Sequence, residues 1–293
     1  MAEETQFTKG LENFGIRLFS ELVKTNRQKN IVFSPFSIQT CIAMARMGAE
    51  GQTALQMDEG LALSAQNPDD LAKQYNSVLA VYENSPILKI ANKIYIMEGY
   101  KFQAKFNELL TKQFFSTAES LDFAQSEESA NTINHWVESK TNNLIKNLVS
   151  PNVLGADTRL VLVNAIHFKG EWEKQFPERS TREADFYIDE TNTVKVQMMH
   201  INDRFRYGEF EDLDAAALEM PYKDSDLSML VILPNSRTGL ADLEEKLKNV
   251  TLKDLSQRMY TTKVIVGMPK FKAEFDVELS EPLKKVRPGI LFF

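Results

Sequence analysis

Residues 161–172 decide the fold, and they read Val161-Leu162-Val163-Asn164-Ala165-Ile166-His167-Phe168-Lys169-Gly170-Glu171-Trp172. From Leu160 to Phe168 the stretch is almost continuously apolar, interrupted only by Asn164 and His167. An apolar run of this length predicts a central β-strand that is covered on both faces. The strand therefore belongs to a sheet with other elements packed above and below it.

The sequence before this strand is mainly helical. Apolar residues at steps of three and four predict a helix over 7–24, and Asn67-Pro68 supplies a cap and a first helical residue for a helix over 69–83. Alternating apolar residues over 88–97 predict a strand. The remaining predicted helices of this part start at Ser34 with Pro35, cover about 102–114, and run from the capping residue Ser126 to about 148 before Pro151.

Short strands dominate the sequence after residue 158. Strands are predicted at 186–188 and 194–196 around the turn 189–192, and at 227–233 before Pro234. Helical sequence follows at about 239–260, then strands at 263–268 and 271–279 and a short helix at 281–286. No repeat, low-complexity tract or linker separates helices from strands, so we expect one mixed α and β domain.

Composition narrows the classes of partner. The 293 residues carry a formal net charge of −7 with both signs mixed along the chain, so we expect no nucleic-acid partner. The first residues are polar and no later stretch is long enough to span a bilayer, which predicts no membrane partner and a cytoplasmic chain as printed. An extracellular location is the alternative if another start supplies a signal. Cys41 lies in an apolar run and is expected to be a buried, unreactive thiol.

The residues that most often carry enzyme chemistry are scattered. His135, His167 and His200 have no metal-ligand spacing, so we expect neither a metal nor a cofactor. There is no Gly-x-Ser-x-Gly elbow and no glycine-rich phosphate loop, and residues 48–51 are interpreted as a turn between helices. The carboxylates of 209–212 fit a solvated loop. We therefore expect that the chain is not an enzyme. The only glycosylation sequon, Asn249-Val250-Thr251, carries little weight on its own.

Several peptides occur in an order that resembles one family. They are Asn30 to Ile38 (NIVFSPFSI), Val161 to Trp172, Leu218 to Tyr222 (LEMPY), Met229 to Pro234 (MLVILP) and Met268 to Lys272 (MPKFK). In type and order they are similar to segments of the serpins, which inhibit serine proteases. The resemblance covers the chain to about Val286. It implies a serpin fold, with a bundle of helices around a large main sheet and smaller sheets.

The resemblance also implies roles for four residues. Ser34, Ser37 and Asn164 match a polar cluster beneath the main sheet, where its strands part, and Trp172 matches the tryptophan near the top of that sheet, where loop insertion begins. Each residue alone also fits an ordinary role: a helix cap, a satisfied core amide or a core aromatic. Only their joint occurrence favours the family role. The helix at 71–83 carries only Lys73 and so lacks the basic stripe of glycosaminoglycan-activated serpins.

In the family, the hinge, the reactive-centre loop and the last core strands follow the helix that matches 281–286. Here residues 287–293 follow it and diverge, so the expectation is a single but incomplete serpin-like domain over 1–286, missing its C-terminal strands, and a divergent tail. If those strands hold five to eight buried side chains at roughly 1.5–3 kcal/mol each, their loss costs on the order of 10–20 kcal/mol. A typical domain has a stability of about 5–15 kcal/mol. The chain alone is therefore expected to be marginally stable or unfolded, with strand 160–168 as an open edge.

Three functions are compared on this basis. The leading one is a serine-protease-inhibitor family member whose 293 residues do not inhibit by themselves, because inhibition requires insertion of the cleaved loop into the main sheet. The second is a non-inhibitory carrier or chaperone-like serpin body that accepts an exogenous strand, or self-associates, at the open sheet edge. The third, an enzyme, has no supporting group of residues. The target protease is not readable, because specificity resides in the loop.

Overall fold

The structure is a computed structural model that describes residues 6–27, 29–61, 67–101, 103–273, 275, 277 and 279–286. The chain forms two compact units, one of residues 1–169 with 275–293 and the other of residues 170–274. The single-domain organisation expected from the sequence stays a prediction, and the expected tail at 287–293 lies outside the described residues.

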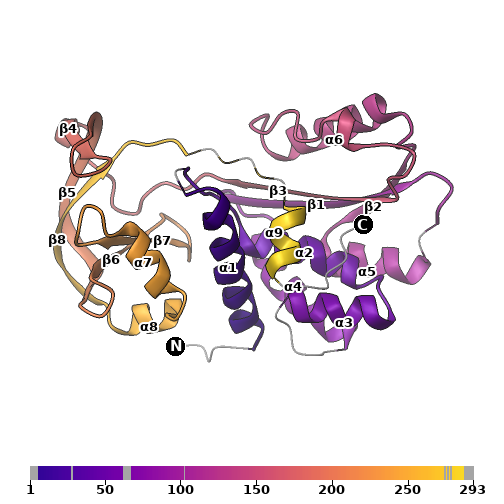
Figure 1. Ribbon diagram of the computed structural model, residues 1–293, viewed down its shortest axis with the longest axis horizontal. Coiled ribbons are helices and arrows are strands. Elements are labelled where there is room, and N and C mark those ends of the chain that lie inside the picture. Colours follow the sequence, from indigo (N-terminus) through magenta and orange to yellow (C-terminus); the bar gives the residue numbers. More distant parts are fainter. Residues whose placement is uncertain are drawn as a thin grey trace. The chain divides into compact units, whose positions relative to one another are not determined.

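The first unit is a three-stranded sheet with helices on both faces (Figure 1). Its strand order is β2-β1-β3, with β2 parallel and β3 antiparallel to β1. Its elements are α1 (Gln6–Thr25), α2 (Pro35–Arg46), α3 (Gly51–Gly60), α4 (Pro68–Tyr82), β1 (Leu88–Met97), α5 (Ala104–Phe114), β2 (Thr117–Leu121), α6 (Ser126–Lys140), β3 (Leu160–Phe168) and α9 (Ser280–Val286), with a 3-10 turn at Pro151–Val153.

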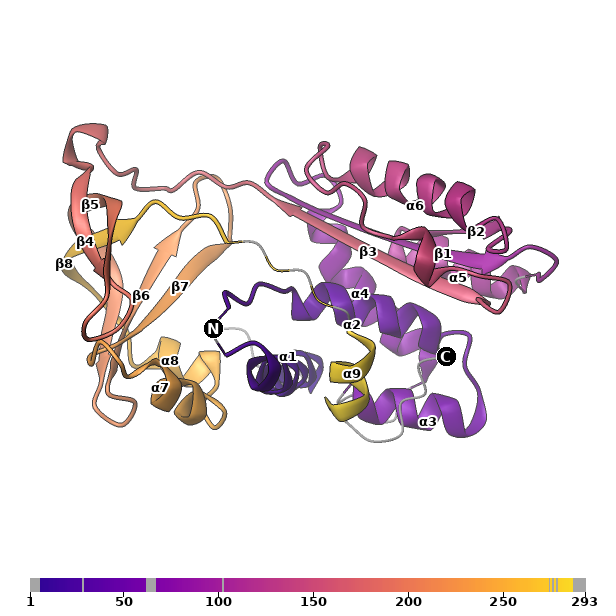
Figure 2. The ribbon, with the colours of Figure 1, turned by 45° about the horizontal axis from the view of Figure 1, so that its top comes forward.

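The two faces of this sheet have different apolar cores. Helix α6 lies over one face, and α2 and α4 lie on the other (Figure 2). On the α6 side, Tyr95, Val163 and Ala165 pack with Phe123, Ile133 and Val137. On the other side, Ile94 joins the core of α1, α2, α4 and α5, to which α9 adds Leu283 and Val286. The predicted coverage of strand 160–168 on both faces is confirmed, because Val163 and Leu162 belong to opposite cores.

Close contact between α1 and α2 depends on a small residue. A Cβ on Gly15 would lie 3.1 Å from Cγ of Pro35, at the start of α2, so any larger side chain would push the helices apart. Pro35 in turn is tolerated because the first residue of a helix has no N–H partner to lose.

The second unit is built on the long strand β5. The strand order is β4-β5-β6-β7, and β8 pairs with β5 over residues 198–207. Helices α7 and α8 contribute Leu243 and Leu255 to a core with Phe210 and Ala217. The elements are β4 (Arg182–Tyr187), β5 (Thr193–Phe210), β6 (Ala215–Pro221), β7 (Ser228–Pro234), α7 (Leu240–Leu247), α8 (Leu252–Gln257) and β8 (Tyr260–Pro269), with a 3-10 turn at Glu178–Ser180.

Most predicted elements are confirmed, but both ends of the helix predicted from Ser126 to about 148 differ. Helix α6 ends at Lys140 rather than near 148, because Asn142, Asn143 and Asn147 take left-handed backbone angles, with φ of 51°, 60° and 54°. Asparagine is one of the few residues that adopt this conformation readily. Ser126 is the first helical residue rather than the cap, which is Gln125.

Near the C-terminal end the predictions are right in part. The helices predicted at about 239–260 are confirmed as α7 and α8, which the chain separates by a turn between Leu247 and Leu252. The strand predicted at 271–279 is not found among the described residues of that range, none of which is in a ladder. An alternating sequence alone does not make a strand, since the backbone groups need a neighbouring strand to bond. Strands β2 and β6 were not predicted, β5 was predicted only over 194–196 although it spans Thr193–Phe210, and α3 was implied only by the predicted turn between helices at 48–51.

Candidate functional site: a polar chain beneath strand β3

The start of α2 brings the first predicted site residue into place. Ser34 has extended backbone angles, and its hydroxyl accepts a hydrogen bond of 3.2 Å from the backbone N–H of Ser37. This bond satisfies one of the backbone donors that the first turn of a helix leaves without a partner.

Ser37 connects the helix to the sheet. It is fully buried, and its hydroxyl donates to the Oδ1 atom of Asn164 at 2.5 Å. Asn164 lies in the middle of β3 and is half-buried. The structure therefore brings together the three polar residues that the sequence singled out, Ser34, Ser37 and Asn164.

The chain of hydrogen bonds continues into two residues that the sequence did not single out. The Nδ2 atom of Asn164 donates to Oδ1 of Asn92, which is its direct partner in the β1–β3 register. The backbone carbonyl of Asn92 accepts a bond of 2.7 Å from the hydroxyl of Ser116, just before β2. Asn92 and Ser116 are both buried. Asn92 could have been singled out from the sequence, because it is an asparagine within a predicted strand. Ser116 follows a predicted helix, and no sequence pattern there indicates a buried role.

This set, which we call the polar chain, consists of Ser34, Ser37, Asn164, Asn92 and Ser116. It links α2 to all of the sheet, because its members lie on or beside β3, β1 and β2. Buried polar groups that are fully bonded specify one arrangement of the elements they join. The polar chain thus holds the strands in register beside the apolar core of α1, α2, α4 and α5.

Strand β3 is paired on one side only within the described residues. Its nine residues bond to β1, and the order β2-β1-β3 leaves its other side, the β3 edge, without a described partner. A strand edge exposes unpaired N–H and C=O groups that can bond an additional strand. Asn164 is the member of the polar chain that belongs to this edge strand.

Trp172 lies in the second unit. It forms an isolated antiparallel bridge with Tyr222, and their rings stack with centroids 4.7 Å apart and an interplanar angle of 12°. The backbone supports the stack on either side, since Glu173 N–H donates to Pro221 and Lys223 N–H donates to Glu171. Trp172 packs against the core of Phe205 and Met220. The role by resemblance at the top of a sheet stays a prediction.

Two potentially reactive side chains are buried. Cys41 is 7% exposed, and burial raises the pKa of its thiol to about 12, so the thiolate is scarce at neutral pH. The expected burial of Cys41 is confirmed, and its low reactivity stays a prediction. His167 is also buried, on the α6 side of β3, and its Nδ1 atom has no hydrogen-bond partner among the described residues.

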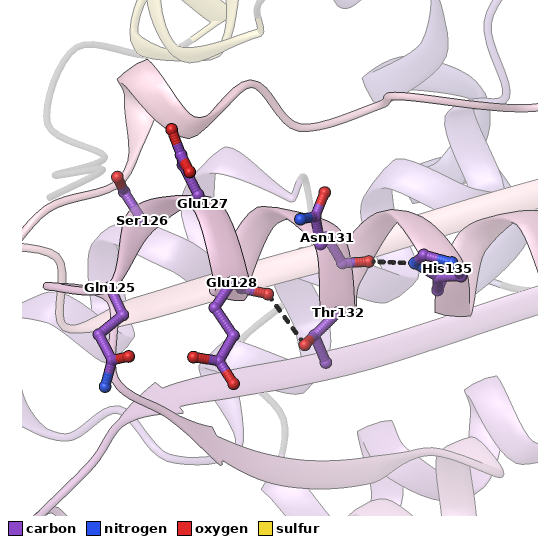
Figure 3. A pocket seen from close by; sticks show the side chains of 7 residues that line it. All are labelled: Gln125, Ser126, Glu127, Glu128, Asn131, Thr132 and His135. Carbon is purple, nitrogen blue, oxygen red and sulfur yellow. Dashed lines mark hydrogen bonds between the residues drawn. The ribbon is translucent and has the colours of Figure 1, made fainter.

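A hollow runs along the first turns of α6, from Gln125 to His135 (Figure 3). Its side chains bond their own helix: Thr132 donates to the carbonyl of Glu128, and Nδ1 of His135 bonds the carbonyl of Asn131. Every described residue that lines it comes from this one stretch. The described residues also contain no group of three or more His, Cys, Asp or Glu placed to hold a metal.

No helix in the described part of the chain is both long and apolar enough to cross a membrane.

Comparison with known proteins gives the class first. The solved structure described as "Cleaved Serpin 42Da" matches 97% of this chain with a TM-score of 0.93 and 53% sequence identity, and the match covers 76% of that chain. Alaserpin of Manduca sexta is 38% identical over 299 residues, covering 100% of this chain and 76% of the relative. Antichymotrypsin-2 of Bombyx mori is 37% identical over 288 residues, covering 97% of this chain and 76% of the relative.

The architecture is therefore the mixed α and β fold that serpins share. The family model for serpins, serine protease inhibitors, matches residues 9–292. The chain belongs to the serpin family. This is a family of protease inhibitors, not of proteases, and the resemblance read from the ordered peptides is confirmed.

Proposed function

We propose that this chain is the body of a serine-protease inhibitor that acts by insertion of a cleaved reactive-centre loop. Its partner is a serine protease, which cleaves the loop of a form that carries one. The observation that supports this proposal is the β3 edge, a strand paired on one side above a bonded polar chain. Insertion of a loop as an additional strand needs such an edge, and the polar chain holds the sheet to which the strand is added.

A polypeptide of only the printed 293 residues is proposed to be non-inhibitory by itself. None of its described segments is a loop placed between strands of the three-stranded sheet. We propose the inhibitory function for a product that contains a hinge and a loop. Reading the transcript downstream of the codon for Val286 identifies such a product, including one made by alternative splicing.

The test is to mix this polypeptide with a panel of trypsin-like, chymotrypsin-like and elastase-like proteases. We expect no complex that survives denaturing electrophoresis, whereas a product extended by a hinge and loop forms one with at least one protease. An active-site-blocked protease is the control, because it cannot acylate. A denaturant-stable complex with the 293-residue polypeptide would show that the inhibitory segment lies within it.

A second candidate function is that of a non-inhibitory carrier or chaperone-like body that accepts an exogenous strand. The β3 edge is the specific observation that favours it, and self-association through the same edge is its competing outcome. An extended peptide of alternating small and polar residues should raise the melting temperature, because a ligand that binds only the folded state stabilises it. A peptide with proline at alternate positions is the matched control, since proline removes the ladder donors. Equal effects of both peptides would count against strand addition.

The cellular location of the protein is also a proposal. We propose a cytoplasmic location for the protein, with an extracellular location as the alternative. Fractionation of cells that produce the native protein distinguishes the two, because only an extracellular protein is recovered from the medium.

A further inference from the structure

The sequence Asn249-Val250-Thr251 forms the turn between α7 and α8 in the second unit. The N–H of Asn249 donates to the carbonyl of Lys246, and the N–H of Val250 donates to that of Leu247. Val250 is partly buried against the core that contains Leu213 and Leu243. Because Val250 is anchored inward, the residue before it is held at the surface.

Asn249 is exposed, and its carboxamide forms no hydrogen bond with the described residues. Thr251 is the cap of α8: its hydroxyl accepts from the N–H of Asp254 at 3.1 Å and donates to the Asp254 carboxylate at 2.7 Å. The Asp254 carboxylate also accepts from the backbone N–H of Thr251, which completes a capping box. The third residue of the sequon thus has a structural role of its own, and the first has none.

We propose that Asn249 is the acceptor of an N-linked glycan in any form of this protein that enters the secretory lumen. The sequence matches the acceptor pattern Asn-x-Thr with a residue other than proline in the middle, and such acceptors lie on surface loops. The donor is an oligosaccharide linked through a diphosphate to a polyisoprenoid lipid. A bond forms between Nδ2 of Asn249 and C1 of the first sugar, while the bond from C1 to the phosphate oxygen breaks. The lipid diphosphate leaves with the electron pair, and one amide proton passes to a base of the transferase.

The fold accommodates this modification without rearrangement. A glycan on Nδ2 projects into solvent, because the carboxamide is free and the adjacent Val250 holds the turn from the other side. The capping box involves only Thr251 and Asp254, so it is retained in the modified chain. The proposal is independent of protease inhibition and of strand addition.

The experiment translates the full chain behind a cleavable signal in a cell-free system with endoplasmic-reticulum microsomes. A short tag that carries a second acceptor sequon follows the signal, so that entry into the lumen is reported separately. The parent chain is expected to show two steps in mobility that endoglycosidase H removes. Asn249→Gln should show one step, because it loses the acceptor and nothing else.

Two further variants separate the sequon from the helix cap. Thr251→Ser keeps the hydroxyl, the sequon and the cap, and is expected to retain both steps. Thr251→Ala removes all three and is expected to show one. A parent chain that shows only the step of the tag would overturn the proposal, and so would a second step that persists in Asn249→Gln.

Discussion

Removing the carboxamide of Asn164 tests the polar chain at its centre. Asn164 accepts the hydroxyl of Ser37 and donates to the carboxamide of Asn92, so Asn164→Ala breaks both bonds at once. Ser37 is fully buried and Asn92 is 6% exposed, so neither is readily rescued by bulk water. Each buried polar group left without a partner costs about 1–3 kcal/mol. Two such groups would together lower the free energy of unfolding by about 2–6 kcal/mol. Because Asn164 itself is half-buried, we expect a loss at the lower end of this range, about 2–3 kcal/mol.

Urea unfolding followed by tryptophan fluorescence measures this loss. Trp136 lies on α6 above the sheet of the first unit, so a Trp172→Phe background lets Trp136 report that unit alone. Sucrose at a fixed concentration keeps a marginal chain folded, because it strengthens effective burial. The variant should lower the midpoint at an unchanged slope. The control is Asn107→Ala, an exposed asparagine in α5, which should change the stability by less than about 0.5 kcal/mol.

A double-mutant cycle with Ser37→Ala shows whether the loss comes from the bond. Ser37 and Asn164 share one hydrogen bond, so the double variant should lose less stability than the sum of the single variants. The reasoning is refuted if Asn164→Ala costs less than about 0.5 kcal/mol, or if the two losses simply add.

Three further predictions concern other described groups. Asp58→Ala should lower the free energy of unfolding by about 3–5 kcal/mol, because it leaves the buried Arg46 without the carboxylate that accepts two of its hydrogen bonds. Glu108→Ala, which removes the exposed ion pair with Lys112, should change the stability very little. Thermal melts of the two variants compare these losses. Cys41, whose pKa burial raises to about 12, should react with a thiol reagent at pH 8 only as fast as the first unit opens, and labelling of the native chain at the rate of a free thiol would contradict this. The hydrogen bond from the Asn192 side chain, supported by backbone N–H groups, lowers the pKa of Asp189 to about 2. The ionised Asp189 carboxylate therefore contributes stability above the pKa of an unfolded-chain aspartate, and this contribution is lost as the pH falls through about 2. Asn192→Ala should raise the pKa of Asp189 in a carboxyl NMR titration.

The sequence predicts those features that depend on local chemistry. Ser34 and Pro35 specify the start of α2 because a hydroxyl cap and a missing N–H are properties of the residues themselves. The strand at 160–168 is likewise predictable, since an unbroken apolar run needs two covered faces. The joint placement of Ser34, Ser37 and Asn164 followed only from the resemblance, because 127 positions separate the two residues that bond.

Features that depend on contacts between distant segments were either not predicted from the sequence or predicted incorrectly. The chain leaves α6 at Lys140 through a series of left-handed asparagines, although apolar residues such as Ile145 continue the helical spacing beyond it. Asn92 becomes part of the site only because the β1–β3 register places it opposite Asn164. The alternating residues of 271–279 predicted a strand, yet a ladder requires a neighbour that no single segment can reveal.

We propose that a further strand is added at the β3 edge, above the polar chain. Hydrogen–deuterium exchange of the 293-residue polypeptide, with and without the alternating peptide, tests this claim most directly. We predict that the peptide slows exchange within residues 160–168, and that Asn164→Ala weakens this protection while Asn107→Ala does not. Unchanged exchange in β3 when the peptide is bound, with protection confined to other strands, would contradict strand addition at the β3 edge.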